Sequence, residues 1–437
     1  MDTVCLKQFR EISIAIHKFN PMNMKAFKLP APVIAFLFFF SLLFSSCRDE
    51  VLRTRTYMAR VPFYISVAEL RSQGNIVQAP QELSVPGKIY IYGDYLFISE
   101  VNKGIHVVDN TNPANPRFIS FINIAGNADM AVNSNMLYAD NYVDLIVFDI
   151  SNLAKISPVK RVENVFESQF IDKAKGLILG FKDSLITTVI NNSYSGRNKQ
   201  EFDASPNASF IGAGSYGTGG STARFTLMSG NLYTVDNFSL RLFNVVNPRE
   251  PVYVNKINIG GGIETIFPYE NKLFIGSTTG MHIFDATNPS APVKLSTYRH
   301  VTSCDPVVVQ GKYAYVTLRS GNFCQQGVNV LDVLDIEDAT KPKLVSSFPM
   351  LNPHGLTVTA TNLFVTEGKF GLKTFDHANV LTIGQRQLAF LTDIDAADII
   401  AGPKSLIVTG IKGIYQYNYS NPAALKLLSH LPLSNTM

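Results

Sequence analysis

Eight polar residues recur at one position of a repeating pattern in this 437-residue sequence. Each lies in or beside a short apolar segment, eight or nine residues before a marker residue in the next apolar segment. The eight are Lys88, Asp129, Gln169, Arg224, Glu264, Asp305, His354 and Asp398. Their acidic members could bind a cationic ligand group or a metal, and His354 could add an imidazole for acid–base chemistry. That chemistry requires a fold that brings these distant residues to one place.

The repeat that carries these residues is about forty residues long. Its markers are 40 to 55 residues apart: Leu96, Leu137, Leu177, Leu232, Leu273, Ala314, Leu363 and Leu406. Each copy contains four short segments rich in β-branched and aromatic residues, and helix signals are almost absent. This period is typical of β-propeller blades. We therefore predict an all-β fold, a propeller of about eight four-stranded blades, or of seven if the third copy does not close into a blade.

A propeller would gather the eight polar residues, called the ring residues below, around one mouth of its central channel. The first strand of each blade lines the channel, and the turns between second and third strands open on the same face. Those turns add Arg319 and Glu367. Two interpretations remain open. The acidic ring residues form a binding mouth, or the ring is structural, with ion pairs between Lys88 and Asp129 and between Arg224 and Glu264.

Two further features of the repeats carry expectations. His106 and His282 occupy one position of the third strand, which other copies fill with Arg241, Asp332 and Lys373. This variety of polar types predicts a strand position that faces outward rather than a pair of ligands. The wide gap after the third copy indicates a polar, glycine- and serine-rich insertion over residues 191–222.

The N-terminus predicts export from the cytoplasm. Lys25 and Lys28 precede an apolar run over residues 31–40, in the order of a signal peptide covering residues 1–46. Phe44-Ser45-Ser46-Cys47 resembles a bacterial lipobox, in which Cys47 would be lipidated, and residues 48–50 are similar to the export signal of surface lipoproteins. We expect a tether over residues 47–60, the propeller over residues 61–437, and a surface-exposed position on the outer membrane. A periplasm-facing position, or a cleaved signal with Cys47 as an ordinary thiol, is the alternative.

The cysteine count and the net charge limit the kinds of site and partner that the protein can have. Cys304 and Cys324 would be the only remaining pair in an oxidising compartment, so we predict a structural disulfide between them. Removing residues 1–46 takes five of 38 basic and two of 34 acidic residues, which leaves 33 and 32. A nearly neutral chain gives no general attraction to nucleic acid. No complete motif for a metal or a cofactor is present, so we expect neither.

The segment from Cys304 to Val309, continued through Tyr313–Arg319 to Asn352–Leu356, resembles the LVIVD-repeat family of bacterial surface and secreted propellers. The resemblance covers about residues 87–422. It implies the propeller fold and a cell-surface setting, and it implies no activity. The absence of Trp disfavours WD-repeat and quinoprotein propellers.

These observations predict a monomeric surface lipoprotein that binds a protein, peptide or glycan at the channel mouth without catalysis. Two alternatives stay open: a hydrolase or lyase that uses Asp305, His354 and Glu264, and an envelope scaffold that contacts its partner through the rim of the propeller. The candidate ligand-binding residues are Lys88, Asp129, Arg224, Glu264, Asp305, Arg319, His354, Glu367 and Asp398.

Overall fold

The computed structural model describes residues 53–72, 76–167, 171–172, 174–190, 222–299, 306–320 and 328–434. Five predictions fall outside these residues: the signal peptide, the lipidated Cys47, the ring residues Gln169 and Asp305, and the disulfide between Cys304 and Cys324. Most of the predicted insertion, residues 191–221, also lies outside them. The chain divides into two compact units, one with residues 1–60 and 183–201, the other with residues 61–182 and 202–437.

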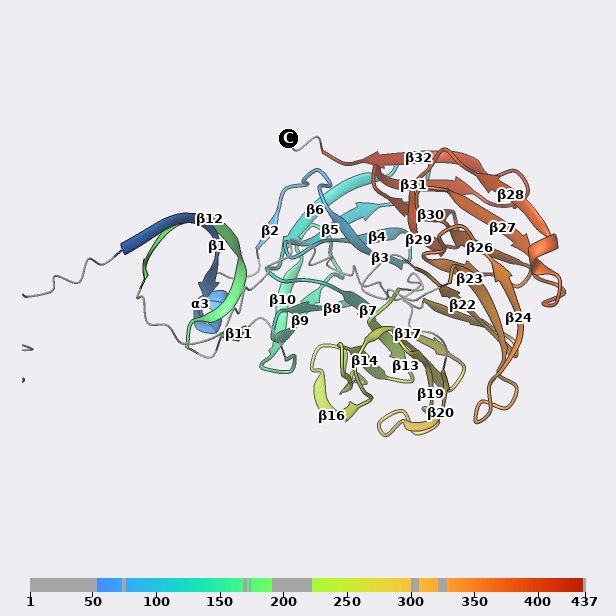
Figure 1. Ribbon diagram of the computed structural model, residues 1–437, viewed down its shortest axis with the longest axis horizontal. Helices are drawn as coiled ribbons and strands as arrows, with labels where there is room; N and C mark the ends of the chain where they lie inside the picture. The colour runs from blue at the N-terminus through green and yellow to red at the C-terminus, as the bar shows by residue number, and fades with distance from the viewer. Residues whose placement is uncertain are drawn as a thin grey trace, which may run out of the picture. The chain divides into compact units, whose positions relative to one another are not determined.

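The larger unit contains a propeller of seven four-stranded antiparallel blades (Figure 1). Blade one contains β3 (Pro86–Tyr92), β4 (Tyr95–Glu100), β5 (Gly104–Asp109) and β6 (Arg117–Asn123); blade two contains β7 (Met130–Asn133), β8 (Met136–Asn141), β9 (Asp144–Asp149) and β10 (Ser157–Val162); blade three contains β13 (Phe225–Met228), β14 (Asn231–Val235), β15 (Ser239–Asn244) and β16 (Val252–Asn258).

The remaining blades follow the same order from the inner to the outer strand. Blade four contains β17 (Ile263–Tyr269), β18 (Lys272–Ser277), β19 (Gly280–Asp285) and β20 (Val293–Arg299); blade five contains β21 (Val307–Gln310), β22 (Tyr313–Leu318), β23 (Val330–Asp335) and β24 (Lys343–Pro349). Blade six contains β25 (Leu356–Val358), β26 (Asn362–Thr366), β27 (Leu372–Asp376) and β28 (Gln387–Leu391), with the short helix η2 (Ile383–Gln385); blade seven contains β29 (Ala396–Ala401), β30 (Leu406–Gly410), β31 (Gly413–Asn418) and β32 (Lys426–Pro432).

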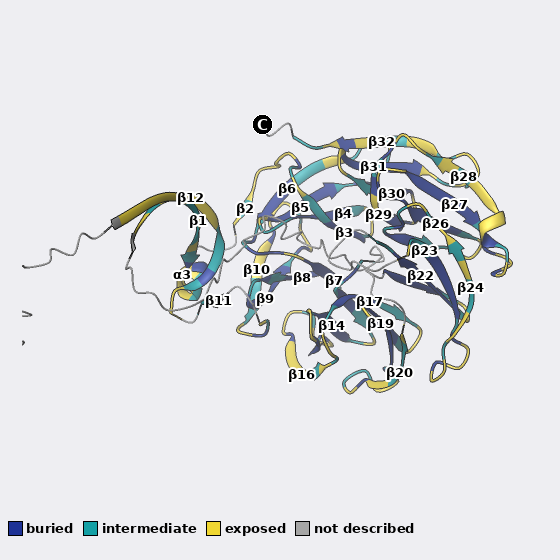
Figure 2. Cartoon of the chain, in the orientation of Figure 1, coloured by how far each residue is buried: buried dark blue, intermediate teal, exposed yellow. Residues whose placement is uncertain are grey.

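The position of a strand within its blade determines how far it is buried. The second and third strands, such as β4 and β5, are almost entirely buried, because neighbouring blades cover both of their faces. Outer strands such as β16 are largely exposed, and Figure 2 shows this gradient from dark blue to yellow. The apolar runs of the sequence therefore mark the two central strands of each blade, where both faces need apolar side chains.

Glycine begins the third strand of several blades for a steric reason. Gly104 has a φ of +150°, and a Cβ there would lie 2.0 Å from the carbonyl oxygen of Ile122 in the fourth strand. Gly280, Gly371 and Gly413 repeat the arrangement, each against a carbonyl of its own fourth strand. The repeated glycine is thus required by the close approach of β5 and β6 and of their counterparts.

Blades one and seven close the propeller. Leu83 pairs with Leu433 in a parallel bridge, and the backbone N–H of Ser434 donates to the carbonyl of Leu83 at 2.6 Å. Apolar side chains of the two blades share one core cluster, to which Ile89 and Ile407 belong. The short strand β2 (Val77–Gln78) adds a fifth strand to the outer edge of blade one.

The third sequence repeat is not a blade, so the propeller has the smaller of the two expected blade numbers. Its marker Leu177 lies in β12 (Gly176–Ile190), which forms a three-stranded sheet with β1 (Arg53–Ile65) and β11 (Ile171–Asp172). β12 continues without a turn through the positions where other copies turn from the second strand to the third. Residues 61–65 therefore lie outside the four-stranded blades and do not close the propeller.

A short helix packs on blade two. Leu70 of α3 (Val67–Ser72) shares a small apolar cluster with Val143, in the turn between β8 and β9. Arg71 binds Asp144 through two hydrogen bonds, of 2.7 and 2.8 Å, and Asp144 also accepts a hydrogen bond from Arg161 at 2.9 Å. The two arginines, with other hydrogen bonds, lower the pKa of the buried Asp144 in spite of its burial, so this carboxylate is a structural anchor for α3.

Candidate functional site

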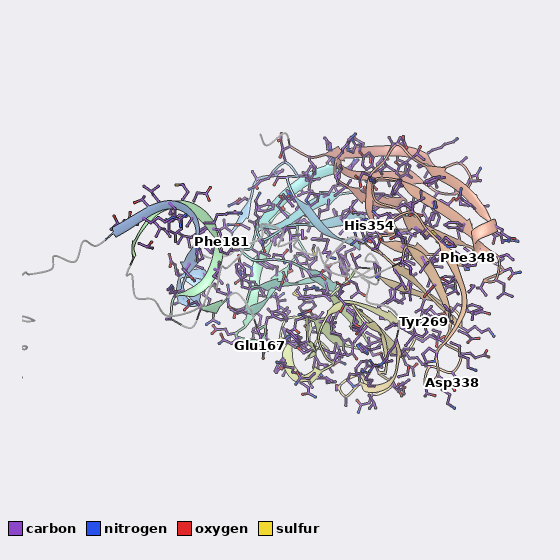
Figure 3. The ribbon with its side chains drawn as sticks, in the orientation of Figure 1. Glu167, Phe181, Tyr269, Asp338, Phe348 and His354 are labelled. Atoms are coloured by element: carbon purple, nitrogen blue, oxygen red, sulfur yellow. The ribbon has the colours of Figure 1, made fainter. Side chains whose placement is uncertain are left out.

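Six of the ring residues are described, and each comes from a different blade. Lys88 lies in β3, Glu264 in β17 and Asp398 in β29, whereas Asp129, Arg224 and His354 come just before β7, β13 and β25. Asp305, which is outside the described residues, precedes the inner strand of blade five in the sequence. Figure 3 labels His354 toward the inner strands, with Phe348 and Asp338 on the outer side. The fold thus brings these six described residues to one mouth of the channel.

Thr222 joins two ring residues that come from blades one and seven. Lys88 Nζ donates to the Thr222 carbonyl at 2.8 Å and to its hydroxyl at 2.9 Å. The same hydroxyl donates to Asp398 Oδ2 at 2.8 Å. Thr222 precedes the inner strand of blade three, so this entry segment reaches across the channel mouth. The sequence offered only a weak signal for this residue, its place at the end of the predicted insertion.

Asp129 connects blades two and three through backbone groups. Its carboxylate accepts the N–H groups of Met130 at 2.7 Å, Arg224 at 2.8 Å and Phe225 at 3.2 Å, and the residue is 1 % exposed. Arg224 in turn donates its Nε to the carbonyl oxygen of Glu264 in blade four at 3.3 Å. Among the described residues, the predicted pairs of Lys88 with Asp129 and Arg224 with Glu264 do not form. Asp129 and Arg224 bind backbone groups of the next blade instead.

Burial controls the ionisation of this group. It lowers the pKa of Lys88 to about 7, against the attraction of Asp129 and Asp398. Burial likewise raises the pKa of Asp129 to about 8, against the attraction of Lys88 and two backbone N–H groups. A raised carboxylate pKa is a common property of catalytic acids. Asp129, however, uses both oxygens for backbone N–H groups, so a substrate has no access to it.

His354 is a neutral imidazole, so only its unprotonated nitrogen can accept a hydrogen bond, and donor groups of Arg319 and Asn352 lie within reach of it. Arg319 Nη1 lies 3.1 Å from its Nδ1 and 3.0 Å from its Nε2, and Asn352 Nδ2 lies 3.0 Å from Nε2. Burial, together with the charge of Arg319, lowers the pKa of His354 to about 3. Its backbone is fixed by Thr317, which donates to the His354 carbonyl at 2.7 Å, and by the Thr366 carbonyl. This environment does not provide the free lone pair that a general base needs.

Glu367 positions the segment that leads to His354. The fully buried carboxylate accepts the N–H groups of Leu351 at 2.9 Å and Asn352 at 2.6 Å, and it binds Lys373 Nζ at 2.6 Å. Groups of the protein itself thus occupy the Glu367 carboxylate. Glu367 lies at the same mouth as Arg319 and His354, and its role there is structural.

The pair of Glu367 and Lys373 recurs in other blades. Glu100 bonds His106 at 3.1 Å, and Asp236 bonds Arg241. The prediction that this third-strand position faces outward is wrong, because His106, Arg241, His282, Asp332 and Lys373 are all buried. Neighbouring blades cover both faces of the strand, and an acid at the end of the second strand bonds the buried residue in three of the blades.

Exposed apolar side chains surround the same mouth, which the sequence did not predict. The turns between second and third strands carry Phe238, Phe370 and Ile411, which are 56, 36 and 65 % exposed. The turns lie beside the entries to the next inner strands, as the hydrogen bonds from Ile263 N–H to the Asn237 carbonyl and from Gly368 N–H to the Ala396 carbonyl show. In blade two the corresponding turn residue, Val143, is buried beneath α3. We call this side of the propeller the mouth face.

The described residues offer no metal centre. Nowhere in the described ranges do three His, Cys, Asp or Glu residues come close enough to hold a metal ion. The helices in the described part of the chain are also too short or too polar to cross a membrane.

Comparisons with known proteins identify the repeats and the fold. LVIVD repeats match residues 87–123, 125–163 and 303–349, which correspond to blades one, two and five. The chain therefore carries LVIVD repeats, as its sequence predicted. No curated protein sequence matches it.

Among solved structures, the fold is similar to Sqt1 from Saccharomyces cerevisiae, with a TM-score of 0.52, 8 % identity, and coverage of 81 % of this chain and 88 % of that one. It is also similar to the computationally designed protein Ika8, with a TM-score of 0.51, 8 % identity, and coverage of 82 % and 90 %. BamB from Moraxella catarrhalis gives a TM-score of 0.46 at 9 % identity over 86 % and 92 %. At these identities the likeness to Sqt1 and Ika8 shows the propeller fold alone.

Proposed function

We propose that this propeller is a non-catalytic binding module that holds a protein or peptide on its mouth face. One observation supports this function above others. The catalytic-type groups of the mouth are bound to the protein itself, whereas Phe238, Phe370 and Ile411 are exposed on the same face. Aromatic side chains on an otherwise polar surface are typical anchors of protein interfaces. A glycan could use the same aromatic faces, and it is the alternative ligand.

Arg224 adds a cationic group to this surface. Among its guanidinium nitrogens, only Nε makes a hydrogen bond with the described residues, at 3.3 Å to the carbonyl of Glu264. Arginine has five N–H donors in a planar fork, and it is frequent in protein interfaces together with aromatic residues. In the proposed complex, Arg224 donates hydrogen bonds to an acceptor group of the ligand, and Phe238 and Phe370 make apolar contacts with it.

The proposed setting is the outer surface of a bacterial outer membrane, with a lipid on Cys47 as the anchor. The support is the order of the N-terminal sequence: basic residues, an apolar run and the tetrapeptide ending at Cys47. The test is a mass measurement of the N-terminal peptide from membrane fractions. An acylated Cys47 supports the anchor, and a free or absent Cys47 opposes it.

The binding function is tested by comparing two matched double variants. Phe238→Ser/Phe370→Ser removes two exposed apolar side chains from the mouth face, and Val252→Ser/Val254→Ser removes two from the outer strand β16. Tagged proteins are cross-linked on intact cells, and the recovered partner is quantified. We expect at least a tenfold lower recovery for the mouth-face variant alone, since each interface hot spot contributes about 2 kcal/mol or more.

The rim provides a second candidate function. Val252, Tyr253 and Val254 are exposed on β16, at the outer edge of blade three and away from the mouth. Exposed apolar strand edges are attachment sites for other proteins, and this one favours an envelope scaffold. The same pair of variants separates the two functions, because a rim scaffold loses its partner with the Val252→Ser/Val254→Ser protein.

A further inference from the structure

The smaller compact unit contains a ribbon with no buried residue among those whose burial is described. It consists of residues 53–60 of β1 and residues 183–190 of β12, which are neighbours in one sheet. Met58 and Leu185 are 63 and 69 % exposed, and Tyr57 is 40 % exposed. Figure 2 shows the described residues of these stretches in yellow and teal, with none in dark blue. A two-stranded ribbon without a covered face is only marginally stable in water, so the ribbon needs a surface to rest on.

The two faces of the ribbon differ in charge. Thr56 bonds Thr187 through their hydroxyls at 2.9 Å, and Arg60 lies 3.9 Å from Asp183, so these four residues share one face. Side chains alternate between the faces of a strand, which places Arg55 and Tyr57 on the other face. The Arg55 guanidinium lies 5.7 Å from the centre of the Tyr57 ring. The face with Arg55 and Tyr57 therefore carries a cation and an aromatic group, while Asp183 lies on the opposite face.

The ribbon as a whole also has a positive net charge. Residues 53–60 contain three arginines and no acid, and Asp183 is the one acid of residues 183–190. Arginine and tyrosine together are typical of segments at a membrane surface, where the guanidinium binds anionic headgroups and the ring lies at the interface. The charge complementarity of the ribbon thus favours a phospholipid surface over a neutral protein surface.

The position of the ribbon in the chain supports the same partner. Only five residues separate Cys47 from Arg53. Even a fully extended segment of that length spans about 20 Å. A lipid on Cys47 would therefore hold the ribbon within about 20 Å of the bilayer, where its positive face can reach the headgroups.

We propose that the ribbon formed by residues 53–60 and 183–190 is a second membrane contact, which binds anionic lipid headgroups through its Arg55 and Tyr57 face. The inference rests on the proposed lipid anchor for its geometry, but headgroup binding can be measured without the anchor. Headgroup binding would fix the orientation of the N-terminal segment on the membrane, which a flexible lipid tether alone does not do.

The test uses the full mature chain with Cys47→Ala, which carries no lipid. Its co-sedimentation is measured with phosphatidylcholine vesicles and with vesicles that contain about one third phosphatidylglycerol. We expect binding only to the anionic vesicles, with loss at high salt, because surface charge interactions are screened. Arg53→Gln/Arg55→Gln should weaken binding about 30-fold, since each basic residue near an anionic surface contributes about fivefold.

A matched control removes the same charge elsewhere. Lys155→Gln/Lys412→Gln deletes two exposed lysines of the propeller and should leave vesicle binding unchanged. Equal losses in both double variants would overturn the proposal, as would equal binding to neutral vesicles. A concentration-dependent dimer that the arginine changes abolish would also overturn it, because the ribbon would then cover a second copy. Acylation of Cys47 is measured separately, so a failed anchor and a failed headgroup contact give different results.

Discussion

The carboxylate of Asp129 in blade two accepts the backbone N–H of Arg224 in blade three at 2.8 Å. A side chain that the sequence marked as a ligand-binding candidate thus ties two blades together. This bond explains how a buried acid can occur at the start of an apolar inner strand without an ion-pair partner, since backbone N–H groups satisfy both oxygens. Loss of this hydrogen bond is the basis of the first prediction.

Asp129→Ala should destabilise the protein by about 2 to 5 kcal/mol, because it leaves several buried backbone N–H groups without acceptors. The free energy of unfolding in urea measures this loss. Glu82→Ala, at an exposed site outside the strands, is the control and should change it by less than about 0.5 kcal/mol. An Asp129→Ala protein as stable as the control would show that Asp129 is free to serve a ligand.

Glu367→Gln should cost about 3 to 5 kcal/mol, because it breaks the buried pair with Lys373. Glu337→Gln breaks the exposed pair with Lys312, at 2.8 Å, and should cost less than about 1 kcal/mol. Both variants remove one charge and leave the side-chain volume almost unchanged. The difference between their free energies of unfolding in urea therefore measures the effect of burying the ion pair. Equal effects of the two changes would contradict the structural part assigned to Glu367.

His354 should remain neutral in the folded protein down to about pH 3. The unfolded chain binds a proton at this residue below its ordinary pKa of 6.5, so the unfolded state holds more protons between these values. Stability should therefore fall as the pH decreases from about 6.5 toward 3, and His354→Gln should reduce that slope. The check is the urea midpoint of both proteins at pH 7 and pH 4.5. A midpoint difference that does not change with pH would contradict the neutral imidazole.

The disulfide between Cys304 and Cys324 stays a prediction, because both residues lie outside the described ranges. The oxidised mature chain should show no free thiol after unfolding, and Cys304→Ser should expose one. A bond that closes a loop of about twenty residues stabilises a protein by about 3 kcal/mol in the chain-entropy model. Two titratable thiols in the oxidised wild type would exclude the bond.

The repeats were sufficient to predict the fold, but not to decide the blade number. The markers from Leu96 to Leu406 recur because each blade buries the same central strands, so their spacing predicts propeller blades. The copy at Leu177 keeps the marker and loses the turn, and β12 pairs with β1, a segment more than a hundred residues away. Such a long-range pairing leaves no periodic signal in the sequence.

The sequence predicted where the described candidate residues lie, but not which groups they bind. Strand spacing placed Lys88, Asp129, Arg224, Glu264, His354 and Asp398 at one mouth because each occupies the same register in its blade. The actual partners could not be predicted, since they are backbone groups, as for Asp129, or a residue outside the repeat pattern, as for Thr222. The outward-facing interpretation of His106 failed because a polar residue can be buried when an acid such as Glu100 lies beside it.

Hydrogen exchange of the propeller with and without its cross-linked partner tests the central claim most directly. If the mouth face binds the partner, amides of residues 236–239 and 367–371 should exchange more slowly in the complex, because these turns carry Phe238 and Phe370. Amides of β16 should exchange at the same rate in both states. Slower exchange confined to β16, with the two turns unchanged, would contradict binding at the mouth.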